Sequence, residues 1–360
     1  STGGQIMPPI MGAAAFLMAE YMDLPYATVA VKAILPAVLY FTGIFIAVHL
    51  EAKKLGLKGF EDEMPKWADL GKKIYLLAPL VLLVWLVSSG AKTMQFSAAV
   101  SILAAVIVGF LNKDERLTFK KIFEALEAGA KGAITVAVAC AIAGMIAGCI
   151  TVTGLASILI NAIVQLAGSA TFIGLILTMV CCIVLGMGVP TTANYCIMAS
   201  TCAPILIKMG FPLVAAHFFV FYFGIVADIT PPVALAAYAG SAIAKGNPMK
   251  TGINATKLAI AAFIVPYIFA YSPAMLFVNV TSVWEVIQIV LSALLGIFGV
   301  AAGLEGFVLR KMNWLYRIVC LVGGLGLMIP GAISDLVGLV LIGGVFVIQY
   351  LQNKKEREIA

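Results

Sequence analysis

The residues best suited to chemistry form one compact, uncharged run, Gly186-Met-Gly-Val-Pro-Thr-Thr-Ala-Asn194. Glycine lets a backbone turn tightly and present its carbonyl groups, and proline stops a helix because its ring clashes and it lacks an N–H donor. Thr191 and Thr192 add hydroxyl oxygens, and Asn194 adds an amide oxygen. Unwound carbonyls and such side chains form the oxygen shells in which transporters hold Na⁺. We therefore predict an ion-binding segment here.

Apolar stretches flank this run, 171–185 before it and 195–208 after it. Two short helices joined by a polar tip indicate a re-entrant hairpin, since irregular backbone at membrane depth must be buried in protein or line a watery cavity. The unpaired N–H groups at the start of the second arm would attract a carboxylate. We predict this hairpin over 170–210; the alternative is an extracellular loop between two short spans.

A short phrase occurs twice, as Pro8-Pro9 and as Pro231-Pro232, 223 positions apart. Each double proline follows a polar, glycine-containing stretch and precedes an apolar segment. Proline cannot continue the helix before it but suits the first turn of the helix after it, which predicts helices over 9–22 and 231–244. Paired breaks in corresponding positions point to the binding site of a secondary transporter.

Asp228 stands alone in an apolar segment just before the second double proline. An acid at that depth is by default an ion ligand or a proton carrier; the alternative is a cap for the helix at 231. We expect Na⁺ near Gly186, Thr191, Thr192 and Asp228, with H⁺ as the other candidate for the coupling ion. The expected ion- and substrate-binding set offers carbonyls or side-chain oxygens from the tip and both breaks: Ser1, Thr2, Gly3, Gly4, Gly186, Gly188, Pro190, Thr191, Thr192, Asn194, Gly224, Asp228 and Thr230.

Composition identifies the elements that must position these residues. Of 360 residues, 62% are hydrophobic and 11% are charged, and apolar runs of about 20 residues, enough to cross a bilayer, recur along the chain. We therefore predict an all-α, polytopic membrane protein with discontinuous helices and a re-entrant hairpin. Seven cysteines in apolar segments and two separated histidines indicate packing, with no cofactor, metal-ligand or catalytic pattern.

Lysines and arginines set the orientation. They gather in the loops 52–73 and 112–131, after 244, near 310–317 and in the C-terminal tail, so the net charge of +6 is a topology signal and does not indicate nucleic acid. The positive-inside rule places all these clusters in the cytoplasm. Helix 9–22 then runs outward and helix 231–244 runs inward, as the two copies of an inverted repeat would.

Several longer motifs resemble one transporter family. The runs 186–195, 215–224 and 229–238 resemble the large membrane subunit of TRAP transporters, and Ser1–Pro9 with Val48–Lys54 resemble its TAXI branch. The resemblance covers roughly 1–280. It implies an inner-membrane permease with an elevator-type motion, taking up an organic acid, usually with Na⁺, delivered by a periplasmic binding protein. It also implies a small membrane subunit, separate or fused upstream, and an earlier half of the permease before Ser1.

The chain then divides into four parts: the end of the first repeat over 1–52, cytoplasmic loops and two connecting spans over 53–131, the second repeat over 132–280 with its hairpin and the broken helix 213–244, and a three-span C-terminal extension over 281–360. Two other classes of protein remain open. A carrier or channel on a similar inverted repeat would work without a binding protein. An intramembrane enzyme would need paired acids or a Ser/His pair, which the sequence lacks.

Overall fold

The computed structural model describes residues 2–8, 11–57, 71, 73–89, 93–112, 116–168 and 170–359. Within these ranges the regular elements are helices, apart from one isolated bridge between Phe307 and Lys311. The all-α prediction is confirmed. The first half contains η1 (Gly3–Gln5), α1 (Gly12–Tyr21), α2 (Tyr26–Lys54), η2 (Ile74–Leu77), α4 (Ala78–Ser88), α5 (Met94–Leu111), α6 (Phe119–Val152), α7 (Leu155–Ala167) and α8 (Thr171–Gly186). The second half contains α9 (Thr191–Thr201), α10 (Ala203–Lys208), α11 (Leu213–Val226), η3 (Ala227–Ile229), α12 (Leu235–Ile243), α13 (Pro248–Leu258), α14 (Ile260–Tyr271), η4 (Pro273–Leu276), α15 (Val283–Glu305), α16 (Trp314–Gly326) and α17 (Ala332–Ile359).

Four helical segments in the described parts of the chain are long and apolar enough to cross a membrane: Tyr26–Lys54, Pro248–Tyr271, Val283–Glu305 and Ala332–Gln352. A bent pair, Gly144–Ile150 with Leu155–Ala167, would add a fifth. Spans of this length match the hydrocarbon thickness of a bilayer, so the protein is a multi-pass membrane protein. Helices α8 and α11 are apolar but shorter, because the hairpin tip and the second break interrupt them.

Local sequence explains several helix boundaries. The side chains of Thr93, Asn247, Ser282 and Asn313 each accept a hydrogen bond from a backbone N–H in the first turn of α5, α13, α15 and α16. Helix α15 ends at Glu305 and is followed by Gly306, whose φ of 67° suits a glycine just past a helix terminus.

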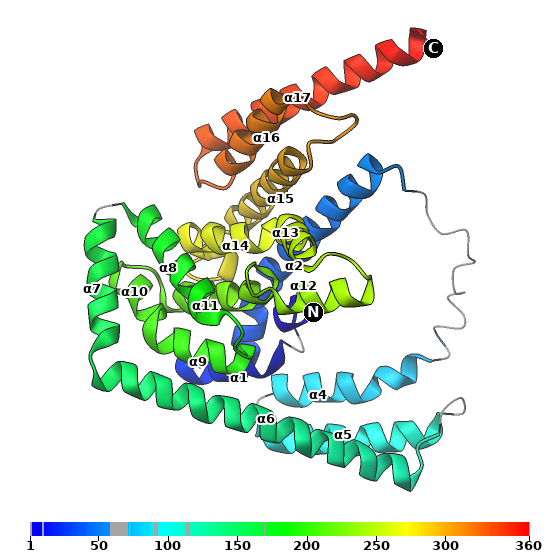
Figure 1. Ribbon diagram of the computed structural model, residues 1–360, viewed down its shortest axis with the longest axis vertical. Coiled ribbons are helices and arrows are strands. Elements are labelled where there is room, and N and C mark those ends of the chain that lie inside the picture. Colours follow the sequence, from blue (N-terminus) through cyan, green and yellow to red (C-terminus); the bar gives the residue numbers. More distant parts are fainter. Residues whose placement is uncertain are drawn as a thin grey trace.

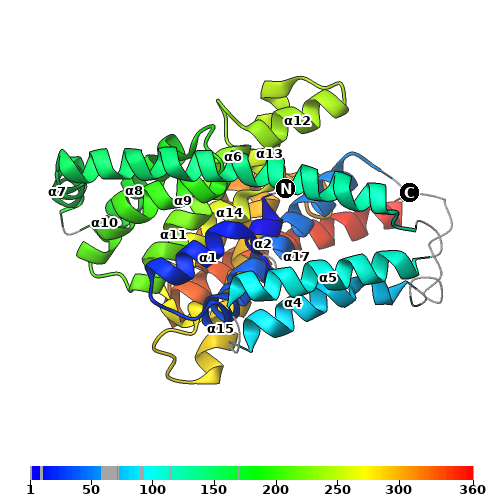
Figure 2. The same cartoon turned by 90° about the horizontal axis from the view of Figure 1, so that it is seen from below.

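Helix α11 lies at the centre of the molecule, and its residues from Val214 to Val226 are all buried. A helix that is apolar on every side is expected in such a position. Helices α8, α9, α10 and α14 pack against it, and their buried side chains form one continuous core with those of α1 and α2. Helices α4, α5 and α6 form a layer below this body in Figure 1, with α6 packed against α9, and α15, α16 and α17 lie above it (Figures 1 and 2).

The two double-proline segments share a backbone form, but the predicted helix starts are wrong. Helix α1 begins at Gly12 and α12 at Leu235, and each follows a residue with positive φ, Met11 at 44° and Ala234 at 31°. These two residues are 223 positions apart, as the prolines are. A residue before a proline is held out of the helical region, so Pro231 cannot begin a helix that contains Pro232.

The helices that follow the two copies run antiparallel, as an inverted repeat requires. Near the start of α2, Lys32 Nζ donates to the carbonyl oxygens of Leu276 and Phe277, both 3.1 Å away and just beyond α14. Further along, Gly43 of α2 packs against Ala261 at the start of α14. As the residue number increases along α2, the number of the residue that it contacts decreases, so α2 runs antiparallel to the segment of α13 and α14.

Candidate functional site

Helices α8, α9 and α10 form a helical hairpin at the predicted position, and its re-entrant placement in the membrane stays a prediction. Helix α8 and the arm formed by α9 and α10 lie antiparallel, because Gly174 packs against Met209 while Cys181 Sγ lies 3.7 Å from Cys202 Sγ. The tip is the short stretch 187–190 between α8 and α9. This geometry brings one end of each arm to the same place, where the tip residues can act together.

Two glycines allow the hairpin to approach the broken helix closely. A β-carbon at Gly186 would lie 2.7 Å from Asn194 Nδ2 and 3.0 Å from Ala227 Cβ, and one at Gly224 would lie 3.2 Å from both Asn194 Nδ2 and Met198 Sδ. The 2.7 Å distance is shorter than real β-carbon contacts, and the 3.0 and 3.2 Å distances are tighter than most of them. The Gly224 carbonyl, expected as an ion ligand, accepts a 3.0 Å hydrogen bond from Asn194 Nδ2 and keeps a second lone pair.

Asn194 is the residue at this junction with an unused acceptor. Its side chain is 1% exposed, and its Oδ1 has no hydrogen-bond partner. Because a carbonyl can only accept, the Gly224 contact fixes Nδ2 toward α11 and directs Oδ1 the other way. Buried polar atoms nearly always have a hydrogen-bond partner. An oxygen without one, beside an interrupted helix, is suited to coordinate a cation.

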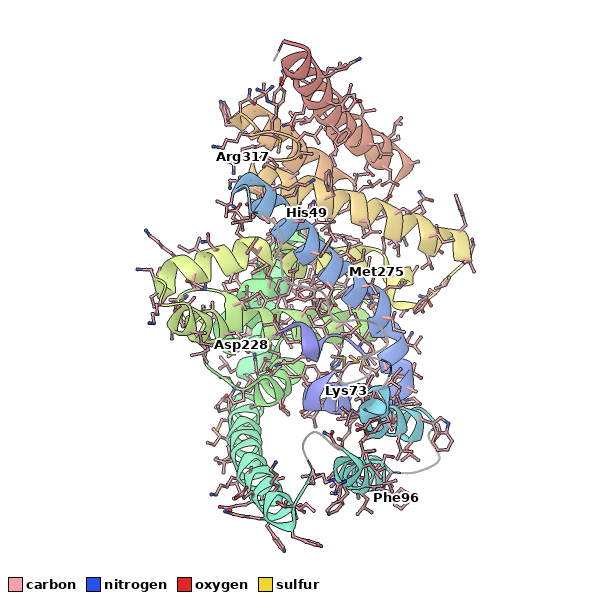
Figure 3. The ribbon with its side chains drawn as sticks, turned by 90° about the vertical axis from the view of Figure 1, so that its right-hand side faces the viewer. His49, Lys73, Phe96, Asp228, Met275 and Arg317 are labelled. Carbon is pink, nitrogen blue, oxygen red and sulfur yellow. The ribbon has the colours of Figure 1, made fainter. Side chains whose placement is uncertain are left out.

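The second break begins in η3, directly after α11. Asp228 lies there half-buried, at mid-height in Figure 3 and well away from Arg317 in the C-terminal helices. Helix α12 begins at Leu235, so Asp228 does not cap a helix that starts at 231. Thr230, expected to bind the ion, donates its hydroxyl to the Val226 carbonyl at 2.8 Å. The peptide bond between Pro231 and Pro232 is cis.

In the first break, as in the second, a threonine hydroxyl makes a short hydrogen bond. The Thr2 and Tyr40 hydroxyls are 2.8 Å apart and buried, and Gly3 packs against Tyr40 and Phe41. Gly4 is exposed. Pro8 ends the described part of this segment, while Ser1 and Pro9 lie outside the described residues.

The two breaks border one cavity of about 280 Å³. Thr2 and Gly3 line it from the first repeat, together with Tyr40 of α2, and Ile229 lines it from the second break. The structure therefore brings the first break next to the residue between Asp228 and Thr230. The sequence pattern predicted both breaks, whereas only the fold shows that they meet.

Residues at the tip face two directions. Gly188, with a φ of 75°, lies toward Val233 of the second break, and Pro190 immediately precedes α9. Thr191 is the first residue of α9. Thr192 borders a second cavity, between α1, α4 and α5, which Glu20 also lines.

Sequence reasoning missed three polar residues of this region. Gln5 has a buried Oε1 with no hydrogen-bond partner, and the same is true of the Tyr222 hydroxyl in α11. Tyr40 holds Thr2. A signal for Gln5 was available, because it lies 223 positions before Asp228, the same offset that relates the prolines. Nothing in the sequence singled out the two tyrosines among many aromatic residues.

A comparison with protein families shows to which family of transporters the chain belongs. The family model for the "Tripartite ATP-independent periplasmic transporter, DctM component" matches residues 1–284, which is most of the 360-residue chain. No protein with a curated description matches the chain. The chain belongs to the DctM family, the large membrane component of tripartite ATP-independent periplasmic (TRAP) transporters.

Proposed function

We propose that this TRAP permease subunit takes up an organic acid across the inner membrane in symport with Na⁺, by an elevator-type motion. It receives the acid from a periplasmic binding protein and works with a small membrane subunit. The family supplies the transporter class and its tripartite organisation. The TAXI branch, the sodium coupling and the organic-acid substrate belong to the proposal.

The observation that carries the ion proposal is the orphaned Oδ1 of Asn194. It lies where the hairpin meets α11. In transporters with broken helices, oxygen atoms at such places coordinate Na⁺. Gln5 Oε1 offers a second buried acceptor in the first break. Two buried amide oxygens without partners, one on the hairpin and one in the first break, favour a cation over an anion, and their neutrality favours Na⁺ over a proton.

The start of α9 supports the acid substrate. No side chain caps this helix, so its first N–H groups have neither an intrahelical acceptor nor a side-chain acceptor. The Thr191 hydroxyl lies at the same end. A carboxylate is the group that such a helix terminus attracts, through free donors and the helix dipole.

Asn194→Ala tests the ion site. In proteoliposomes with the partner proteins, we expect uptake of a labelled dicarboxylate driven by a Na⁺ gradient at fixed pH to fall at least about tenfold, because one coordinating oxygen is lost. The same variant should lose the thermal stabilisation that Na⁺, but not K⁺, gives the wild type.

Ser200→Ala is the matched control on the same helix, since the Ser200 hydroxyl donates to the carbonyls of Cys196 and Ile197 within α9. It should keep both uptake and the sodium effect. Unchanged sodium stabilisation in Asn194→Ala would reject the site. Uptake driven equally well by a proton gradient would point to Asp228 as a proton carrier. Uptake without the binding protein would favour the alternative function, a carrier or channel that works without such a protein.

A further inference from the structure

The C-terminal helices α15, α16 and α17 lie almost entirely beyond the residues that match the DctM family, yet they pack on its core. Helix α15 lies along α2, and a β-carbon at Gly43 of α2 would come within 2.8 Å of Ile297 Cγ2. Ala47 and Leu50 of α2 form a small buried cluster with Ala301 and Ala302 of α15. Leu258 of α13 packs against the same cluster.

Beside this apolar contact lies a group of four charged residues, which we call the Glu305 cluster: Glu51, Lys54, Lys257 and Glu305. Glu305 Oε2 lies 2.6 Å from Lys257 Nζ and 3.6 Å from Lys54 Nζ, and Lys54 also pairs with Glu51 at 2.9 Å. The Glu305 side chain is only 1% exposed, whereas both lysines are more than a quarter exposed. Glu305 is therefore the buried centre of the cluster.

The other two C-terminal helices hold Glu305 in place. Arg317 of α16 donates from Nε to the Gly303 carbonyl at 2.9 Å and from Nη2 to the Leu304 carbonyl at 2.8 Å. These carbonyls belong to the last turn of α15, where a cation is favourable. Gln349 of α17 accepts hydrogen bonds from the N–H groups of Leu309 and Arg310 in the following loop. All three helices thus converge on the end of α15.

The two lysines come from helices that correspond in the two repeats. Lys54 ends α2, which follows the first break, and Lys257 lies near the end of α13, which follows the second break. We propose that the C-terminal unit α15–α17 ties the two repeats together at this end, by inserting Glu305 between α2 and α13. This role depends on neither the substrate nor the coupling ion.

The physical basis is specificity of packing. A buried ion pair gains little net stability over an apolar contact. Separating the partners, however, leaves a buried charge uncompensated, so packing registers that separate them are disfavoured. Apolar small-residue contacts alone, such as those of Gly43 and Ala47, would tolerate a sliding of α15 along α2. A single carboxylate shared by two lysines fixes that position and links both repeats to it.

Amide hydrogen exchange of the full chain in lipid nanodiscs tests the proposal through Glu305→Gln. We expect residues 47–57 and 250–259 to exchange roughly tenfold faster in the variant, both to a similar degree. In the wild type, local opening of either segment must break an ion pair with Glu305, and in the variant this pair is absent. Asp335→Asn is the control. Asp335 lies at the opposite end of the same unit, where it accepts from Gln288, and its variant should leave both segments unchanged.

Charge reversal separates a specific pair from general destabilisation. Lys257→Glu and Glu305→Lys should each accelerate exchange in both segments, and the double variant should restore most of the protection, since opposite charges again meet. Faster exchange confined to α15 and its following loop, or a change in only one of the two segments, would overturn the proposal. So would a double variant no better protected than either single one.

Discussion

At the residue scale, the site depends on Asn194 and on the two glycines that let it reach α11. The sequence indicated oxygen-rich residues at the tip but could not assign their roles. Gly224 was expected to offer a carbonyl, and that carbonyl accepts a hydrogen bond from Asn194 Nδ2, which leaves Asn194 Oδ1 as an acceptor without a partner. Which atom of an amide is left over depends on a neighbour 30 residues away in the sequence.

Gly186→Ala should disrupt this junction. Its β-carbon would meet Asn194 Nδ2 at 2.7 Å, and such overpacking costs about 1–3 kcal/mol. We expect the midpoint of thermal unfolding in lipid nanodiscs to fall by several degrees and sodium stabilisation to weaken. Gly343→Ala in α17 is the control, because a β-carbon there meets nothing within 4 Å. An equal response of the two variants would contradict the proposed close approach.

At the element scale, the repeated phrase predicted two broken helices, and the local backbone repeats as well. Both copies pass through a 3-10 turn, a double proline and a positive-φ residue before the helix begins. Both helices also end alike, with the Leu24 N–H bonded to the Ala19 carbonyl and the Gly246 N–H to the Ser241 carbonyl. The start was misjudged because the rule for proline in a first helical turn ignores the restriction on the residue before a second proline.

Ala234→Gly should stabilise the protein. Ala234 has positive φ, which costs a non-glycine residue roughly 1–2 kcal/mol, and glycine removes only one buried methyl group there. We expect a rise of a few degrees in the thermal midpoint. Met11→Gly should lower the midpoint although Met11 also has positive φ, because the Met11 side chain is fully buried and its loss leaves a cavity that costs about 2–5 kcal/mol. Ala237→Gly, inside α12, should lower it as well, because glycine is about 1 kcal/mol poorer than alanine in a helix. A lower midpoint for Ala234→Gly would contradict the strain at this position.

At the scale of the whole molecule, the basic clusters that were used to orient the chain gather at one end. Lys54 and Lys257 meet at Glu305, and Arg317 lies within hydrogen-bonding distance of the same turn. The start of α6 and the end of α17 also lie toward one edge, the right-hand one in both views (Figures 1 and 2). The opposite end carries Lys32 with Leu276, and Gln288 with Asp335.

Cysteine labelling checks the orientation of these two ends. In a background without the native cysteines, Lys311→Cys should react with a membrane-impermeant maleimide only from the cytoplasmic side, because the positive-inside rule places it there. Val280→Cys, near the start of α15 and 39% exposed, should react from the periplasmic side. Labelling of both positions from one side would contradict the arrangement of α15 as a span.

The sequence by itself determined the all-α membrane fold, the hairpin and its tip, the two paired breaks and the family. These follow from local properties, namely apolar run length, proline and glycine chemistry and loop charge. Only the tertiary structure decided that the breaks share a cavity, that Asn194 keeps an unpaired oxygen, and that Glu305 joins Lys54 to Lys257. Each of these depends on contacts between residues far apart in the chain, and no local pattern encodes which of many similar side chains will meet.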